Sequence, residues 1–209
     1  MPSAPETISL GQVFTVIFVM LGPLKILGPF AARSRDMEAG VVRRIALLAF
    51  VLALIAVLGG GFIGRALARS WGVSPPVLLL AGGVIFALVG LKLVLEQYES
   101  VHTPPPLPAT PLAAAMQVAF PTIVTPYGIA AFIVLLANSH DAARTQGVLA
   151  MLGLVMGLNL LAMLLARLIM RGLGVVVLQL LGAVLGVLQV ALAVNMILRA
   201  LHDLRVIDG

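Results

Sequence analysis

The residues best placed to do chemistry lie inside an apolar segment close to the N-terminus. The stretch MLGPLKILGPF, residues 20–30, places Lys25 between two Gly-Pro pairs. Each proline removes a backbone N–H and clashes with the carbonyl four residues earlier, at a cost of about 3 kcal/mol inside a helix. Backbone groups freed in a bilayer are tolerated only inside protein or beside a wet cavity. The pattern therefore predicts an interrupted helix whose polar groups face a cavity.

A second stretch, FPTIVTPYG at residues 120–128, has the same features and adds the hydroxyls of Thr122 and Thr125. A single proline in a membrane helix is usually only a kink, but two proline pairs at matched positions favour a binding site. The prolines would hold the unwound backbone open, the glycines would admit a solute, and Lys25 would attract its carboxylate. The candidate substrate-binding residues are Gly22, Pro23, Lys25, Gly28, Pro29, Pro121, Thr122, Thr125, Pro126 and Gly128.

The sequence offers no set of residues for catalysis that compares with these two stretches. The carboxylates and histidines all fall in tails, loops or helix ends, at Glu6, Asp36, Glu38, Glu96, Glu99, Asp141, Asp203, Asp208, His102, His140 and His202. Cysteine is absent, which removes thiolate ligands and cysteine nucleophiles. We therefore expect no enzyme, no cofactor and no metal site.

Both lysines of the chain fall within apolar segments, where an ionisable group is a functional candidate. Lys92 lies near the end of its segment, from which it could snorkel to the interface or pair with Glu96. Lys25 lies in the interruption itself, so facing the cavity and facing away from it both stay open. Interhelical hydrogen bonds are the expected role of the other polar candidates, Gln117, Asn159, Gln189 and Asn195.

The composition indicates what surrounds these residues. Hydrophobic residues make up 61% of the 209 residues and charged residues only 10%, whereas about a quarter of a soluble domain is charged. The net charge of +5 comes from arginines at the ends of apolar runs, with no basic face for nucleic acid. A lipid bilayer is therefore the expected solvent.

Six segments are long enough to span a bilayer, which takes about 20 mainly apolar residues. They cover residues 9–31, 42–64, 76–96, 111–137, 147–170 and 174–198. The loop after the first segment is rich in arginine, which predicts a cytoplasmic loop and places both termini in the periplasm. Close helix packing is expected at three GxxxG pairs, Gly60/Gly64, Gly153/Gly157 and Gly182/Gly186.

The two halves of the chain match at an offset near one hundred residues. The matched pairs are Pro23/Pro121, Arg43/Arg144 and Gly82/Gly182, with offsets of 98, 101 and 100. We expect one repeat at 1–102, a Pro-rich linker at 103–111 and a second repeat at 112–209. Because three spans are an odd number, the second copy enters from the opposite side. This predicts an all-α membrane protein with a 3+3 inverted repeat, whose helices 1 and 4 are broken at Pro/Gly.

The interrupted segments resemble those of the MarC-type integral membrane proteins, which are related to LysE-like exporters. The family pattern at the first interruption, approximately Asn-Pro-Leu-Gly-x-x-Pro-x-Phe, has the same frame as GPLKILGPF. Similar frames recur at the AGG start of the third span and in the fourth span, which is Pro-x-x-x-Gly-Pro-Gly in the family. The matching residues are Pro23, Leu24, Phe30, Ala81, Gly82, Gly83, Pro121 and Pro126, with Pro29 and Gly128 one residue late.

The resemblance implies a six-span protein of the bacterial inner membrane, and some relatives are described as transporters of small neutral amino acids. This chain departs from the family pattern by carrying Gly22 for the usual Asn, Lys25 for a glycine and Lys92 where many relatives have Asp. We therefore expect a secondary transporter or exporter of a small polar solute, with neutral amino acids favoured, that works by alternating access. The alternative is a non-transporting scaffold or assembly factor. An ion channel also stays open, although no ring of charges indicates one. A coupling ion and a homo-oligomer stay open.

Overall fold

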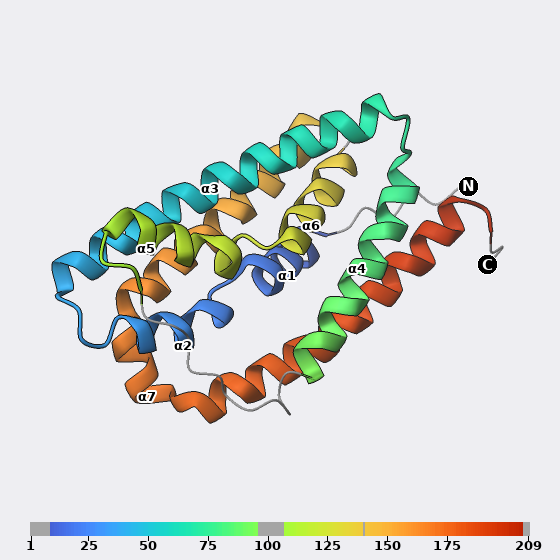
Figure 1. Cartoon of the computed structure of the whole chain (residues 1–209). Coiled ribbons are helices and arrows are strands. Elements are labelled where there is room, and N and C mark those ends of the chain that lie inside the picture. Colours follow the sequence, from blue (N-terminus) through green and yellow to red (C-terminus); the bar gives the residue numbers. More distant parts are fainter. Residues whose placement is uncertain (1–8, 96–106, 140, 207–209) are drawn as a thin grey trace.

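The computed structural model describes residues 9–95, 107–139 and 141–206, and over these residues the chain is helical, with no strand (Figure 1). The elements are α1 (Leu10–Leu21), α2 (Leu24–Arg33), α3 (Ala39–Ser70), α4 (Pro75–Leu95), α5 (Pro111–Val118), the π-helical turn η2 (Ala119–Ile123), α6 (Pro126–Ala137) and α7 (Ala142–Asp203). Within these residues, 5 helices could cross a membrane by length and composition, or 6 if the bent segment from Pro111 to Ala137 counts as one. The expected all-α membrane fold is confirmed.

The last two expected spans are joined differently from the prediction. We expected a loop near residues 171–173, but helical hydrogen bonding continues through this region and α7 is one element of 62 residues. Two stretches of α7 are each apolar enough to span, Ala142–Gly172 and Leu180–Asp203. Figure 1 shows α7 changing direction between its orange and red portions, so the connection is a bend within helix. The absence of proline there explains why the helix does not stop.

The side chains of α3 show how the bundle meets its surroundings. Ala46, Ala49 and Ala53 recur at helical spacing and are fully buried against the other helices. On the opposite face, Val51 and Ile55 are 47% and 64% exposed. Large apolar side chains in this position would be unfavourable in water, whereas lipid solvates them. The exposed face of α3 is therefore a lipid-facing surface.

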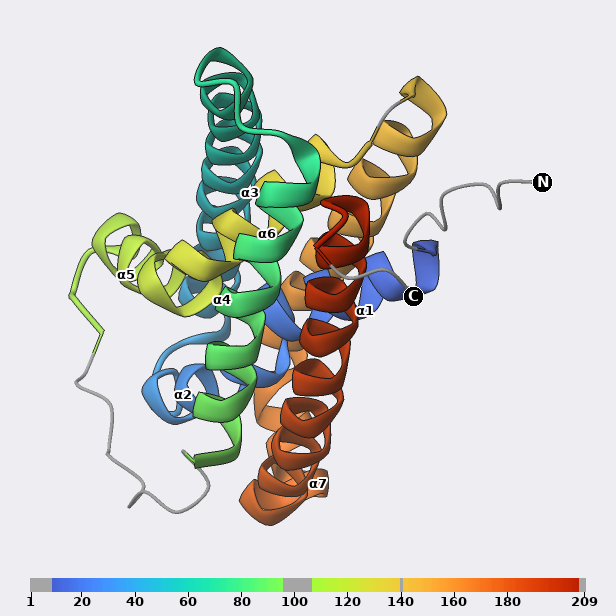
Figure 2. The same ribbon diagram turned by 90° about the vertical axis from the view of Figure 1, so that its right-hand side faces the viewer.

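The helices form two groups that lie around α1. In both Figure 1 and Figure 2, α4 runs beside the C-terminal portion of α7, and α3 lies near α5 and α6. The backbones of α4 and α7 approach closely at Gly90, where an added Cβ would lie 3.0 Å from the carbonyl oxygen of Gly186. A side chain at either glycine would push these two helices apart.

Two of the three GxxxG pairs contribute packing positions and one does not. Gly60 and Gly64 face isoleucine side chains of α6, and Gly186 faces α4. An added Cβ at Gly153 or Gly157 would meet nothing within 4 Å, and both residues are exposed. The prediction that this pair packs against another helix of the chain is therefore wrong, because that face of α7 points outward.

Candidate functional site

The first interruption is a short break in the helix after Leu21. Gly22 has φ −82° and ψ 176°, which is extended, and α2 starts after Pro23. A Cβ on Gly22 would lie 1.9 Å from the carbonyl oxygen of Phe18. The chain can follow this path only because Gly22 has no side chain, so this glycine sets the geometry of the interruption.

The last backbone carbonyls of α1 have no hydrogen-bond partner within the helix, and two side chains outside α1 donate to them. Lys25 Nζ donates to the carbonyl of Met20 at 3.4 Å, and Asn159 Nδ2 of α7 donates to the carbonyl of Leu21 at 2.5 Å. Asn159 is only 1% exposed. Backbone carbonyls buried in an apolar interior need such partners, so the first interruption depends on a contact with the second half of the chain.

The expected interhelical hydrogen bonds are confirmed for Asn159 and for Gln189, whose Nε2 donates to the carbonyl of Phe86 at 3.0 Å. The other two polar candidates behave differently. Gln117 is partly buried with no partner for its Oε1 among the described residues, and Asn195 is exposed. Two of the four therefore stabilise helix contacts.

The second interruption begins in η2, where Phe120 leaves helical geometry at φ −120° and ψ 127°. The helices on either side of it are bent by 62°. Thr125 then caps α6, because its Oγ1 accepts a hydrogen bond from the nitrogen of Gly128 at 3.1 Å. Pro126 takes the first helical position, where a missing N–H costs nothing. This interruption is built from local capping chemistry.

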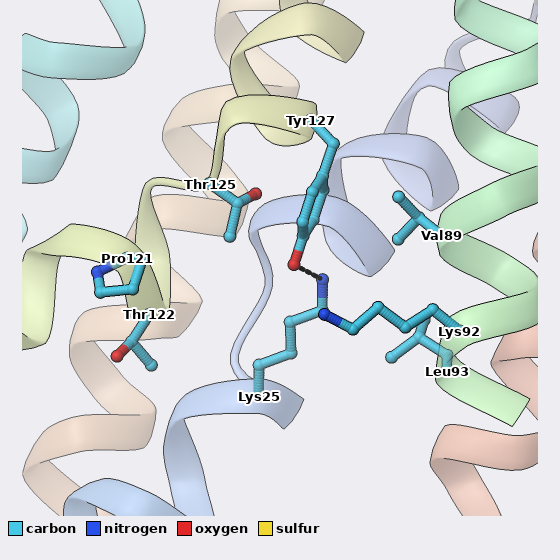
Figure 3. A pocket seen from close by; sticks show the side chains of 8 residues that line it. All are labelled: Lys25, Val89, Lys92, Leu93, Pro121, Thr122, Thr125 and Tyr127. Atoms are coloured by element: carbon cyan, nitrogen blue, oxygen red, sulfur yellow. Dashed lines mark hydrogen bonds between the residues drawn. The ribbon is translucent and has the colours of Figure 1, made fainter. Parts of the chain in front are cut away.

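A cavity of about 270 Å³ lies where the two interruptions meet α4 (Figure 3). Its lining residues come from α2, α4, η2 and the start of α6, and they are Lys25, Val89, Lys92, Leu93, Pro121, Thr122, Thr125 and Tyr127. Lys25 Nζ donates to the hydroxyl of Tyr127 at 3.3 Å and lies 4.6 Å from the centre of its ring. Lys25 therefore links the two interruptions across the cavity.

The cavity brings together part of the predicted residue set. Lys25, Pro121, Thr122 and Thr125 line it. Gly22 and Pro23 form the adjoining interruption, and Pro126 and Gly128 begin α6, so these four shape the backbone and do not line the cavity.

Gly28 and Pro29 do not take the expected place. Both lie inside α2, which runs on to Arg33. The fixed φ of proline is compatible with a helix, and Pro29 costs this helix one backbone hydrogen bond without ending it. The prediction of a second unwound point at Gly28-Pro29 is therefore wrong.

Sequence reasoning did not place Tyr127 and Lys92 in the candidate set. Tyr127 directly follows Pro126 and precedes Gly128, so its position between two candidates was an available signal. The location of Lys92 in a span predicts that it snorkels to the interface or pairs with Glu96. Lys92 is an exposed residue, yet its side chain lines the cavity, and Figure 3 shows it extending toward Lys25. Glu96, its expected partner, lies outside the described residues.

The site can bind but carries no catalytic arrangement within the described residues. Its polar groups are two ammonium groups, the hydroxyls of two threonines and a phenol. Across residues 9–95, 107–139 and 141–206, no group of three or more His, Cys, Asp or Glu side chains could hold a metal ion. Fold and site together define a multi-pass integral membrane protein with a polar cavity between helices.

Sequence comparisons agree with this class and name the family. The sequence model described as MarC family integral membrane protein matches residues 8–204. The chain belongs to the MarC family. A UPF0056 membrane protein of Methanocaldococcus jannaschii is 25% identical over 192 residues, which is 90% of this chain and 94% of that protein.

Bacterial relatives match over a shorter region. The UPF0056 inner membrane protein MarC of Escherichia coli strain K12 is 26% identical over 99 residues, 47% of this chain and 44% of that protein. The protein of the same name in Shigella flexneri matches with the same values. No solved structure matches.

Proposed function

We propose that this protein is a secondary transporter or exporter of a small polar solute that carries a carboxylate, such as an amino acid. The observation that carries the proposal is the cavity at which two interrupted spans meet inside an otherwise apolar bundle. Transporters use half-helix ends and unwound backbone to bind solutes away from lipid. Two interruptions at one cavity lower the stability of the protein. A role in solute binding would explain why the chain keeps both.

Reciprocal contacts between the halves support the proposed inverted repeat. Arg167 of α7 donates to the carbonyl of Ser34, just after α2, and Arg65 of α3 donates to the carbonyl of Ser139, just after α6, at 3.1 Å. Both serines are 1% exposed. Each interrupted span is therefore bound at its end by an arginine of the other half. A two-fold relation between residues 1–102 and 112–209 would produce this exchange.

The helix contacts follow the same exchange. The first half's α3 contacts α5 and α6, while α7 of the second half contacts α1 and α2. In the proposed alternating-access cycle the two halves rock about the interruptions. This movement would break the contact of Arg167 with Ser34 and the contact of Arg65 with Ser139. We further propose the inner membrane of a bacterium as its location, with both termini in the periplasm and with an ion gradient as the candidate driving force.

Flux measurements on the reconstituted protein test the proposal. Purified protein in proteoliposomes is given a pool of labelled amino acids and other small metabolites, with and without proton and sodium gradients. Protein-free liposomes are the control. We expect protein-dependent uptake or release of at least one labelled solute. No flux under any gradient, together with no thermal stabilisation by any solute of the pool, would overturn the proposal in favour of the scaffold alternative.

A further inference from the structure

The two lysines of this chain lie on different helices, 67 positions apart, and both line the same cavity. Lys25 enters it from the start of α2 and Lys92 from the last turn of α4. Figure 3 shows the two side chains extending toward one another, beside the hydroxyl end of Tyr127. We propose that this pair is a binding site for a small oxyanion, whose carboxylate or phosphate oxygens lie between the two ammonium groups.

The charges around the cavity favour an anion. Among the described residues that line it there is no carboxylate, and the two ammonium groups share the space with hydroxyl groups. Two ammonium groups that face one space repel each other. An anion between the ammonium groups replaces this repulsion with two attractions.

The neutral lining groups complete the recognition. Tyr127 accepts a hydrogen bond from Lys25 and keeps its own hydroxyl proton for donation. Thr125 accepts from the nitrogen of Gly128 and likewise keeps a proton to donate. The site therefore offers hydroxyl donors next to the ammonium donors, which suits an oxygen-rich anion with several acceptors. The volume of about 270 Å³ limits the ligand to a small one.

The inference narrows the solute of the proposed function, on which it rests for the placement of solute in this cavity. A neutral amino acid brings its own ammonium group, which would meet two others. A ligand with net negative charge, such as a dicarboxylate, avoids this conflict. The expected order of binding is therefore succinate or inorganic phosphate first, with glycine and uncharged succinamide far behind.

Thermal unfolding of the purified full-length protein in detergent tests the order. The probes are succinate, inorganic phosphate, glycine and succinamide at 10 mM each, with ionic strength held constant by sodium chloride. We expect succinate or phosphate to raise Tm by about 4 °C, and which of them acts identifies the oxyanion. Equal shifts for succinate and succinamide, a shift with glycine alone, or no shift with either anion would overturn the inference.

Substitutions locate the site. Lys25→Met and Lys92→Met should each abolish the anion-dependent shift, while Lys92→Arg should retain it, and the matched control Arg43→Met, at an exposed position, should behave as the unmodified protein. A shift that persists in both Met variants would overturn the inference. If a Met variant does not fold, the Gln variant at the same position replaces it. The thermal shifts of the unmodified protein test the inference without any variant.

Anion binding without any flux in proteoliposomes would keep the anion site and reject the proposed transport. Glycine flux without anion binding would keep transport and reject the anion site.

Discussion

The two interrupted spans differ in where their stabilising groups come from. In the first, Asn159 and Arg167, both of α7, bind carbonyls at the ends of α1 and α2. In the second, Thr125 caps its own helix, and Asn138 and Ser139 bind carbonyls four residues earlier, at 2.9 and 2.8 Å. Arg65 of α3 adds one contact from the other half. The first span is thus stabilised mainly by distant residues and the second mainly by its own.

This difference suggests distinct roles in the proposed cycle. A span whose shape depends on the other half changes its environment whenever the halves move, while a locally capped span keeps its shape. We therefore expect the stability of the first interruption to change when the two halves move. The second would act as a rigid wall of the cavity, presenting Thr125 and Tyr127 from a capped helix start. Substitutions that remove single contacts can test this assignment.

The largest effect is expected at the arginine contacts. Arg167 donates to the carbonyls of both Ser34 and Met37, whereas Arg65 donates to one carbonyl, that of Ser139. Hydrogen bonds to charged groups contribute roughly 1.5–3 kcal/mol each, so Arg167→Met should lower the free energy of unfolding by about 3 kcal/mol and Arg65→Met by about half as much. Unfolding of the purified protein in mixed micelles by added SDS measures both.

Arg43→Met, at an exposed position, is the matched control for these two variants and should change little. Equal losses in the Arg167 and Arg65 variants would remove the asymmetry between the spans. A loss in the Arg43 variant as large as either would show that charge removal alone is responsible.

The sequence predicts the second interruption better than the first, and the reason is physical. A threonine before a proline at the start of an apolar run is a local capping signal, so the start of α6 could be read directly. Asn159 lies 138 positions from its partner Leu21, and Arg167 lies 133 from Ser34. No local rule connects such residues. The fold class and spans follow from hydropathy, but the bend in α7, the helical Gly28-Pro29 and the place of Lys92 depend on tertiary packing.

A smaller effect is expected at the buried amide of the first interruption. Asn159→Leu removes the donor to the carbonyl of Leu21 and leaves that carbonyl buried. The change also removes Asn159 Oδ1, which has no partner within the part of the chain that the structure describes. The net loss in unfolding free energy should therefore fall at about 1–2 kcal/mol. Asn195→Leu, at an exposed position, is the matched control and should be close to neutral; an equal loss there would contradict the assignment.

The smallest change in stability, with the clearest change in transport, is expected at the second interruption. Thr125→Val keeps the shape of the side chain but removes the cap on Gly128 and a hydroxyl from the cavity. Loss of a helix cap costs about 1 kcal/mol, so folding and membrane insertion should survive. Flux in proteoliposomes should fall at least tenfold, and Thr125→Ser, which keeps the hydroxyl, should restore most of it.

The control for this variant is Thr15→Val, because Thr15 carries a hydroxyl that binds the carbonyl of Gly11 outside the cavity. If the Thr15 variant lost as much flux as Thr125→Val, general damage to the helices would explain both results. If Thr125→Val transported normally, the hydroxyl would have no part in solute binding, and only the cap would remain as its role. A loss confined to Thr125→Val and reversed by serine would assign the effect to the Thr125 hydroxyl, which both caps α6 and lines the cavity.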